Sequence, residues 1–125
     1  MKKKNQLDIL TIGLDSLSLE ILKRSLRENR VNYHLSCLQE VGDLASFHKK
    51  NIHAVFFFSN RQSQKTIDDI RRIHQQVPQA AMTLLSPKPE LHGVIGAFRA
   101  GLFDYLTIPL ESSELRTVIY RLKLH

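Results

Sequence analysis

Three side chains that could take part in chemistry stand just after short apolar runs of this chain. They are Asp15, Ser59 and Ser86. A carboxylate can bind a cation, and a serine hydroxyl can accept a phosphoryl group from a kinase or hydrogen-bond a ligand. For each we favour a simpler role: Asp15 as a helix N-cap, Ser59 as the hydroxyl that closes a strand, and Ser86 as a partner of the loop backbone.

Other arrangements that support catalysis or metal binding do not occur in the sequence. The chain has no glycine-rich phosphate loop, no Ser-His-Asp order and no Cys-His arrangement. Its histidines show no spacing typical of a metal site. They are His34, His48, His53, His74, His92 and His125. We therefore expect no enzymatic activity, no cofactor and no metal ion.

Five apolar runs alternate with five amphipathic segments, and this pattern predicts the elements that position those residues. Strands are expected at residues 7–13, 31–37, 54–58, 80–85 and 103–107, with 54–58 central and 31–37 at an edge. Helices are expected at about residues 16–30, capped by Asp15 or Ser16, at 41–48 and around 67–73. A fourth helix is expected from residue 91 to its end at Gly101, and a fifth begins at Glu111 or Ser112. Apolar residues recur at helical spacing in these segments: Leu19, Leu22 and Leu26; Val41 and Leu44; Ile67, Ile70 and Ile73; Leu91, Val94, Ile95 and Phe98; Leu115, Val118, Ile119 and Leu122.

Continuous apolar strands between amphipathic helices favour a parallel sheet that is covered on both faces. We predict an α/β fold, a flavodoxin-like (βα)5 doubly wound sheet with strand order 2-1-3-4-5. In such a sheet the functional sites lie at the carboxyl ends of the strands. The three candidate side chains all fall at that edge.

Bulk composition fits one globular domain. The chain has 125 residues, of which 42% are hydrophobic, and its single Cys37 excludes an internal disulfide. The longest apolar run is far shorter than the ~20 residues of a membrane span, and we expect a cytoplasmic protein without a membrane partner. We predict a flexible basic tail at residues 1–6 and one domain at 7–125. The net charge of +6 is attributed to the basic tail and to solvated helix faces, and we expect no direct binding of nucleic acid. No aromatic residues interleave with the cations as a platform for single strands would require.

The segment at residues 100–109, Ala-Gly-Leu-Phe-Asp-Tyr-Leu-Thr-Ile-Pro, is the most specific in the chain. It resembles the last strand of the receiver domain of two-component response regulators, whose usual wording is close to A-G-A-x-D-Y-L-x-K-P. The resemblance extends from Asp8 to about Leu124, where it is one of pattern and length. It also implies that the Ile108–Pro109 bond is cis.

Receiver domains transfer a phosphoryl group onto an aspartate, and the resemblance implies where the parts should lie. The family carries an acid pair after the first strand, an acceptor Asp after the third, a hydroxyl after the fourth and a lysine after the fifth. The corresponding positions here are Gly13, Leu14 and Asp15; Phe58, or Ser59 if the register moves by one; Ser86; and Ile108. A lone carboxylate does not assemble a Mg²⁺ site, and phenylalanine accepts no phosphoryl group. We predict that the phosphorylation site is degenerate and has an apolar floor.

The resemblance then implies a pseudo-receiver that signals by protein contacts, as a homodimer or against an output domain. We expect this chain to be either a single-domain protein or the N-terminal regulatory domain of a longer transcription regulator. The predicted interaction face comprises the fourth helix, fifth strand and fifth helix: Leu91, His92, Ile95, Arg99, Tyr105, Arg116, Tyr120 and Lys123. The family's mobile aromatic corresponds to Tyr105, which is either a fixed part of this face or a strand residue with its hydroxyl in water.

A sensor for a small ligand is the alternative function. The vacated crevice could bind a metabolite or a nucleotide messenger in an apolar pocket. Arg61 and Lys88 follow the third and fourth strands, so both could reach an anion held there. Neither function predicts a response to acetyl phosphate or to a beryllium fluoride mimic of phosphorylation.

Overall fold

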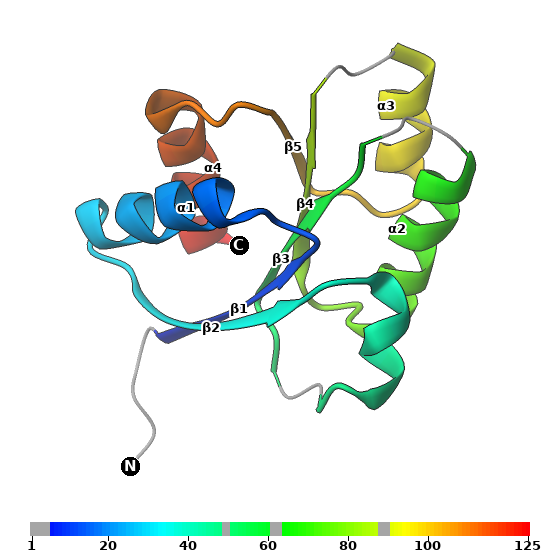
Figure 1. Ribbon diagram of the computed structural model, residues 1–125, viewed down its shortest axis with the longest axis horizontal. Coiled ribbons are helices and arrows are strands. Elements are labelled where there is room, and N and C mark those ends of the chain that lie inside the picture. Colours follow the sequence, from blue (N-terminus) through cyan, green and yellow to red (C-terminus); the bar gives the residue numbers. More distant parts are fainter. Residues whose placement is uncertain (1–5, 49–50, 61–63, 88–90) are drawn as a thin grey trace.

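In the described part of the chain, five strands and four α-helices alternate, with a short 3₁₀ helix in place of the second expected helix (Figure 1). The computed structural model describes residues 6–48, 51–60, 64–87 and 91–125. The elements are β1 (Gln6–Ile12), α1 (Ser16–Glu28), β2 (Asn32–Leu38), η1 (Val41–Ser46), β3 (Ala54–Phe58), α2 (Gln64–Gln76), β4 (Ala81–Ser86), α3 (Leu91–Arg99), β5 (Asp104–Thr107) and α4 (Ser112–Leu124). No helix in these described ranges is long and apolar enough to cross a membrane.

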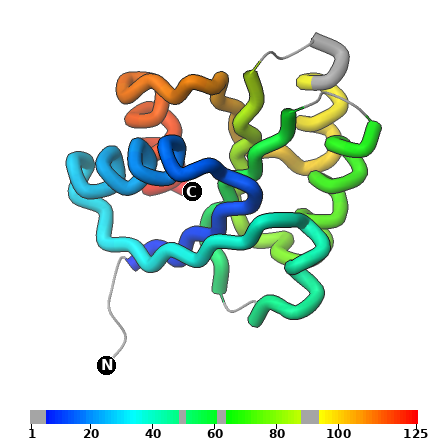
Figure 2. Tube along the Cα trace, in the orientation of Figure 1, coloured from blue at the N-terminus to red at the C-terminus, as the bar shows by residue number. Residues whose placement is uncertain are grey.

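The strands form one parallel sheet in the order β2-β1-β3-β4-β5. This confirms the predicted flavodoxin-like doubly wound fold, with β3 central and β2 at an edge. Helices α1 and α4 contact each other on one face of the sheet, and α2 contacts α3 and η1 on the other (Figure 2). All five carboxyl ends therefore lie along one edge of the sheet.

The core has two halves because β3 is apolar on both sides. Ala54 and Phe56 pack into the cluster beneath α1 and α4, whereas Val55 and Phe57 pack into the cluster beneath α2 and α3. This alternation follows from the two-residue period of a strand. Burial on both faces makes β3 a rigid base for the residues that follow it.

Local signals in the sequence set several element boundaries. The Asp15 carboxylate accepts a hydrogen bond from the Ser18 amide at 2.7 Å, which confirms Asp15 as the N-cap of α1. Gly101 has φ +121° and ends α3 as predicted, and the Leu102 amide then donates to the Ala97 carbonyl at 3.1 Å. The Ile108–Pro109 bond is cis, as the resemblance implied.

The segment expected as a helix at residues 41–48 is shorter and tighter than predicted. It forms the 3₁₀ helix η1, and His48 lies beyond its end. A reciprocal pair of hydrogen bonds between Glu40 and Asp43 closes its first turn. Only Val41 and Leu44 are buried in it, which gives too short an apolar stripe for a longer helix.

Candidate functional site

The loop after β1 lies directly against the end of β3. Gly13 has φ +78°, and its amide donates to the Leu38 carbonyl at 2.9 Å. A methyl group on Gly13 would come within 3.4 Å of the Gln39 carbonyl oxygen and 3.6 Å of the Phe58 carbonyl oxygen. The fold thus brings together two of the sequence-predicted positions, Gly13 and Phe58.

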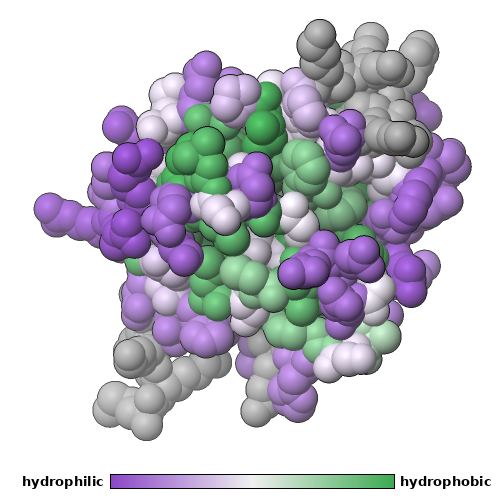
Figure 3. All heavy atoms as spheres, viewed as in Figure 1, coloured by the Kyte–Doolittle hydropathy of each residue, from purple (hydrophilic) through white to green (hydrophobic). Residues whose placement is uncertain are grey.

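Three positions that the resemblance matched to an acid, the acceptor and the lysine share one apolar environment. Leu14, Phe58 and Ile108 are each half-buried, and all pack against the core cluster beneath α1 and α4. Figure 3 shows hydrophobic surface gathered over the start of α1 and toward the sheet behind it. Leu17, in the first turn of α1, leaves 67% of its area exposed. This end of the sheet presents hydrocarbon to solvent.

The described carboxylates near this edge do not form a cluster that could hold a metal ion. Asp15 is used to cap α1, and the part of the chain that the structure describes contains no group of three His, Cys, Asp or Glu side chains suited to a metal ion. Mg²⁺ needs several hard oxygen ligands besides its waters. The described side chains at the ends of β1, β3 and β5 do not provide that chemistry.

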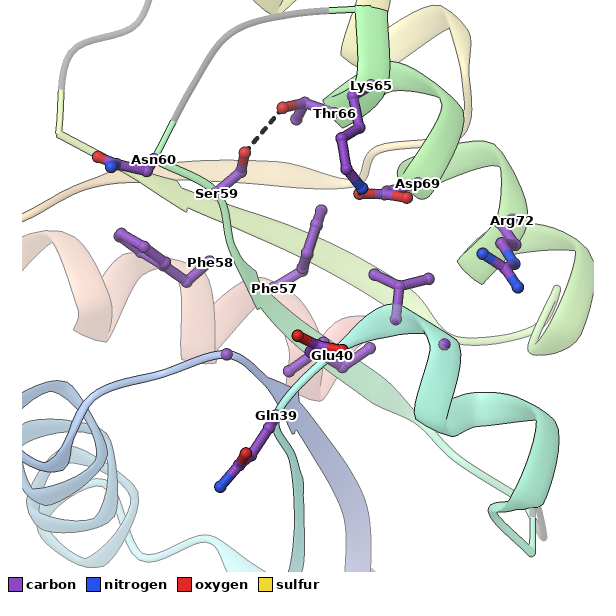
Figure 4. A pocket seen from close by; sticks show the side chains of 14 residues that line it. Gln39, Glu40, Phe57, Phe58, Ser59, Asn60, Lys65, Thr66, Asp69 and Arg72 are labelled. Carbon is purple, nitrogen blue, oxygen red and sulfur yellow. Dashed lines mark hydrogen bonds and ion pairs between the residues drawn. The ribbon is translucent and has the colours of Figure 1, made fainter.

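Ser59 bridges the end of β3 to the first turn of α2. Its hydroxyl lies 2.7 Å from the Thr66 hydroxyl (Figure 4), and its amide donates to the Leu85 carbonyl at 3.0 Å. Thr66 is only 5% exposed. Ser59 therefore has the structural role that we favoured, since both its amide and its hydroxyl connect neighbouring elements.

Ser86 ends β4, and Tyr105 lies on the neighbouring strand β5. Ser86 is 1% exposed, and its carbonyl accepts a hydrogen bond from the Ile108 amide at 3.0 Å. The Tyr105 ring packs against the cluster beneath α2 and α3, and its hydroxyl oxygen is buried. Burial raises the pKa of Tyr105, and the nearby Ser86 hydroxyl opposes that rise. Even so, no described group meets the Tyr105 hydroxyl at full hydrogen-bonding geometry.

The expectation of a Tyr105 hydroxyl in water is therefore wrong. In β5, Asp104 and Leu106 turn toward α4, so Tyr105 must point to the opposite face, which α3 covers. The sequence predicted that side chains alternate between the two faces of β5. It did not predict that the helix on the Tyr105 side would bury the hydroxyl. Tyr105 is held by the fold and offers only part of its ring to solvent.

A groove of about 510 Å³ opens between η1 and α2, next to the end of β3 (Figure 4). Its lining comprises Ile12, Gly13, Gln39, Glu40, Val41, Gly42, Phe57, Phe58, Ser59, Asn60, Lys65, Thr66, Asp69 and Arg72. Ile12, Val41, Phe57 and Phe58 form its apolar part, and polar or charged side chains make up much of the rest. The groove is therefore not the apolar pocket that we predicted. Lys65 forms an ion pair with Asp69 at 3.3 Å. Arg61 and Lys88, which we predicted to overhang the crevice, lie outside the described residues.

Sequence reasoning missed the charged residues of this groove. Lys65, Asp69 and Arg72 are spaced i, i+4 and i+7 on α2, so they share one side of that helix. This spacing was the available signal. That these residues line a groove could not be inferred without knowing how η1 lies relative to α2.

The structure divides the predicted interaction face. Ile95 and Arg99 are exposed on α3, with Ile95 at 40%, and Phe98, which the sequence analysis left out of the face, is 43% exposed beside them. The side chains of Leu91 and His92 lie outside the described residues. Arg116, Tyr120 and Lys123 instead line a groove against α1. The side of α4 that meets β5 carries Arg121, whose guanidinium lies 2.6 Å from the buried Asp104 carboxylate.

Comparison with known proteins identifies the fold. No protein-family model matches the chain, and no curated protein matches it in sequence. The BeF₃-activated receiver domain of DrrB, a Thermotoga maritima OmpR/PhoB homologue, is similar over 96% of this chain and 99% of that one, with a TM-score of 0.76 and 18% identity. A protein described under pilus assembly (cpaE) from Burkholderia thailandensis covers 95% and 99%, with a TM-score of 0.79 and 18% identity.

A third solved structure bears on phosphorylation. It is an atypical orphan response regulator described with a phosphorylation-independent regulatory mechanism. It is similar over 94% of this chain and 93% of that one, with a TM-score of 0.69 and 18% identity. The chain therefore has the fold of response-regulator receiver domains.

Proposed function

We propose that this chain, which has the receiver fold, is a signalling module that works without phosphorylation and acts through protein contacts. The observation that carries the proposal is the shared apolar packing of Leu14, Phe58 and Ile108. Phosphoryl transfer depends on fixed charges that stabilise the transferred group. Hydrocarbon at all three positions supplies neither the acceptor oxygen, the metal ligands nor the cation.

The solved structures support a receiver fold in such a role. One protein with this fold is described as regulated independently of phosphorylation, and another is described under pilus assembly. We infer that the contacts of this chain, rather than a chemical change within it, carry the signal. We propose that it regulates an output domain for transcription in this way.

The test is binding of beryllium fluoride in the presence of Mg²⁺. We expect no change in the melting temperature of this chain, because neither Phe58 nor Ser59 has a carboxylate to receive the fluoride complex. The DrrB receiver domain, which is known in a BeF₃-activated form, is the matched positive control. Stabilisation of this chain that requires Mg²⁺ would contradict the proposal.

We further propose that two copies meet through the face formed by α3, β5 and α4. Ile95 and Phe98 expose apolar area there beside Arg99, a mixture that suits a non-obligate interface. The experiment measures mass by light scattering for the wild type and for the Ile95→Asp/Phe98→Asp variant. We expect a dimer that the double variant dissociates.

The control for dimerisation is Leu17→Asp. Leu17 is more exposed than either α3 residue but lies on α1, so its substitution should leave the mass unchanged. A monomeric wild type, or dissociation by the α1 control alone, would refute the proposed face.

A second candidate function is a sensor for a small anionic ligand, and the groove of about 510 Å³ favours it. Arg72 is exposed there, and no carboxylate of the described residues pairs with it. A thermal-shift screen of nucleotides would detect a ligand, and Arg72→Ala should abolish the shift. Arg71→Ala, on the same helix but outside the groove lining, should preserve it. No shift with any nucleotide would exclude nucleotide sensing.

A further inference from the structure

A second groove lies on the other layer of the molecule, where α1 and α4 contact each other (Figure 1). It has a volume of about 280 Å³. Asn29, at the C-cap of α1, lines it together with Arg116, Thr117, Ile119, Tyr120 and Lys123 of α4. It is separate from the groove beside η1 and α2.

The charge of this groove is entirely positive. Arg116 and Lys123 are exposed, and no lining residue is acidic. The Lys123 ammonium donates to the Asn29 carbonyl at 3.3 Å, which orients the side chain without neutralising it. Among the described residues no carboxylate pairs with either cation. Anionic groups are therefore attracted to this position.

The groove also has an apolar component. Tyr120 is 63% exposed, and Ile119, which also lines the groove, is buried. An exposed tyrosine beside arginine is a combination that is enriched at the centres of protein interfaces. A ligand for this groove should therefore combine negative charge with one apolar side chain.

We propose that the groove between α1 and α4 binds an acidic segment of a partner protein. One apolar side chain of that segment packs on Tyr120, and flanking carboxylates pair with Arg116 and Lys123. A nucleic acid fits less well, because single-strand binding uses successive stacking rings along a basic track and this groove holds one ring. Arg121 contacts Asp104 of β5 and so marks the side of α4 that belongs to the proposed dimer face. The groove residues lie on the side of α4 toward α1, so the groove is separate from that face.

The probe is a fluorescein-labelled peptide of aspartate and glutamate residues around a central Phe-Leu pair, and binding is followed by fluorescence anisotropy. We expect saturable binding that weakens as salt rises, because the contacts are exposed ion pairs. Arg116→Glu/Lys123→Glu should weaken binding about tenfold or more, since attraction is replaced by repulsion. Tyr120→Ala should weaken it as well, whereas Tyr120→Phe should retain it.

The matched control is Arg71→Glu/Arg72→Glu, which changes the net charge equally on the opposite layer at exposed positions of α2. We expect this variant to bind the peptide within about twofold of the wild type, because it changes only the long-range attraction to net charge, which salt screens. Equal losses in both double variants would show attraction to net charge alone and overturn the proposal. Failure of the wild type to bind the peptide, or preferential binding of a single-stranded DNA oligonucleotide at the same salt, would also overturn it.

Discussion

Replacement of Gly101 by alanine should destabilise the fold strongly, and the structure supplies the reason. Gly101 ends α3 with φ +121°, a conformation that side chains rarely adopt. A Cβ atom there would lie 2.8 Å from Cγ of His74 and 3.0 Å from its Nδ1. Contacts this short require the His74 ring, on α2, to move. The substitution thus combines backbone strain with overpacking between α2 and α3.

The expected loss is about 2–3 kcal/mol in the free energy of unfolding. Backbone strain at positive φ costs about 1–2 kcal/mol, and overpacking costs about 1–3 kcal/mol. The reduced entropy of the unfolded alanine chain offsets about 0.4–1 kcal/mol of this total. For a domain of this size the loss corresponds to a fall of roughly 6–12 °C in the melting temperature.

The assay is urea unfolding followed by circular dichroism, with Gly42→Ala as the matched control. A Cβ atom on Gly42 would meet no atom within 4 Å, so that substitution should be neutral or stabilise by up to about 1 kcal/mol. In a His74→Ala background, Gly101→Ala should cost about 1 kcal/mol less, because the overlap is removed and the backbone strain remains. The reasoning is refuted if Gly101→Ala is no worse than Gly42→Ala, or if removal of the His74 ring leaves its cost unchanged.

Three further predictions concern buried polar groups. The Thr83 hydroxyl is buried with no hydrogen-bond partner among the described residues, so Thr83→Val should keep or raise stability, by up to about 1 kcal/mol in urea unfolding; a clear loss would reveal an unseen partner. Arg121→Gln should cost about 1–2 kcal/mol, because the 10% exposed Asp104 side chain loses its cation. The 54% exposure of the Arg121 side chain moderates this cost. Arg71→Gln is the control, because both side chains of its ion pair with Asp68 are exposed, and it should change stability by less than about 0.5 kcal/mol. Equal effects of the two substitutions would contradict this account. Burial raises the pKa of Tyr105 in the folded state. The protonated Tyr105 therefore contributes its full stability below the unfolded-state pKa of about 10, and this contribution is lost as pH rises through the folded-state pKa. Tyr105→Phe should therefore flatten the loss of stability above about pH 10 in pH-dependent unfolding, and unchanged alkaline curves would refute this.

The sequence by itself determined the order of the elements and the class of the fold. These features depend on neighbours along the chain. Apolar runs such as 54–58 define buried strands, Asp15 caps the helix that it precedes, and Gly101 allows the backbone turn that ends α3. Ile108 lies in a segment that otherwise resembles a receiver strand, and it led to the prediction of a degenerate site without any coordinates.

Tertiary packing alone decided which predicted residues meet. The rotation of α4 about its axis placed Arg116, Tyr120 and Lys123 against α1 and Arg121 against β5. The cover over β5 buried the Tyr105 hydroxyl. Such outcomes depend on how one element seats on another across the sheet, and a helical period indicates which residues share a side but not what that side will face.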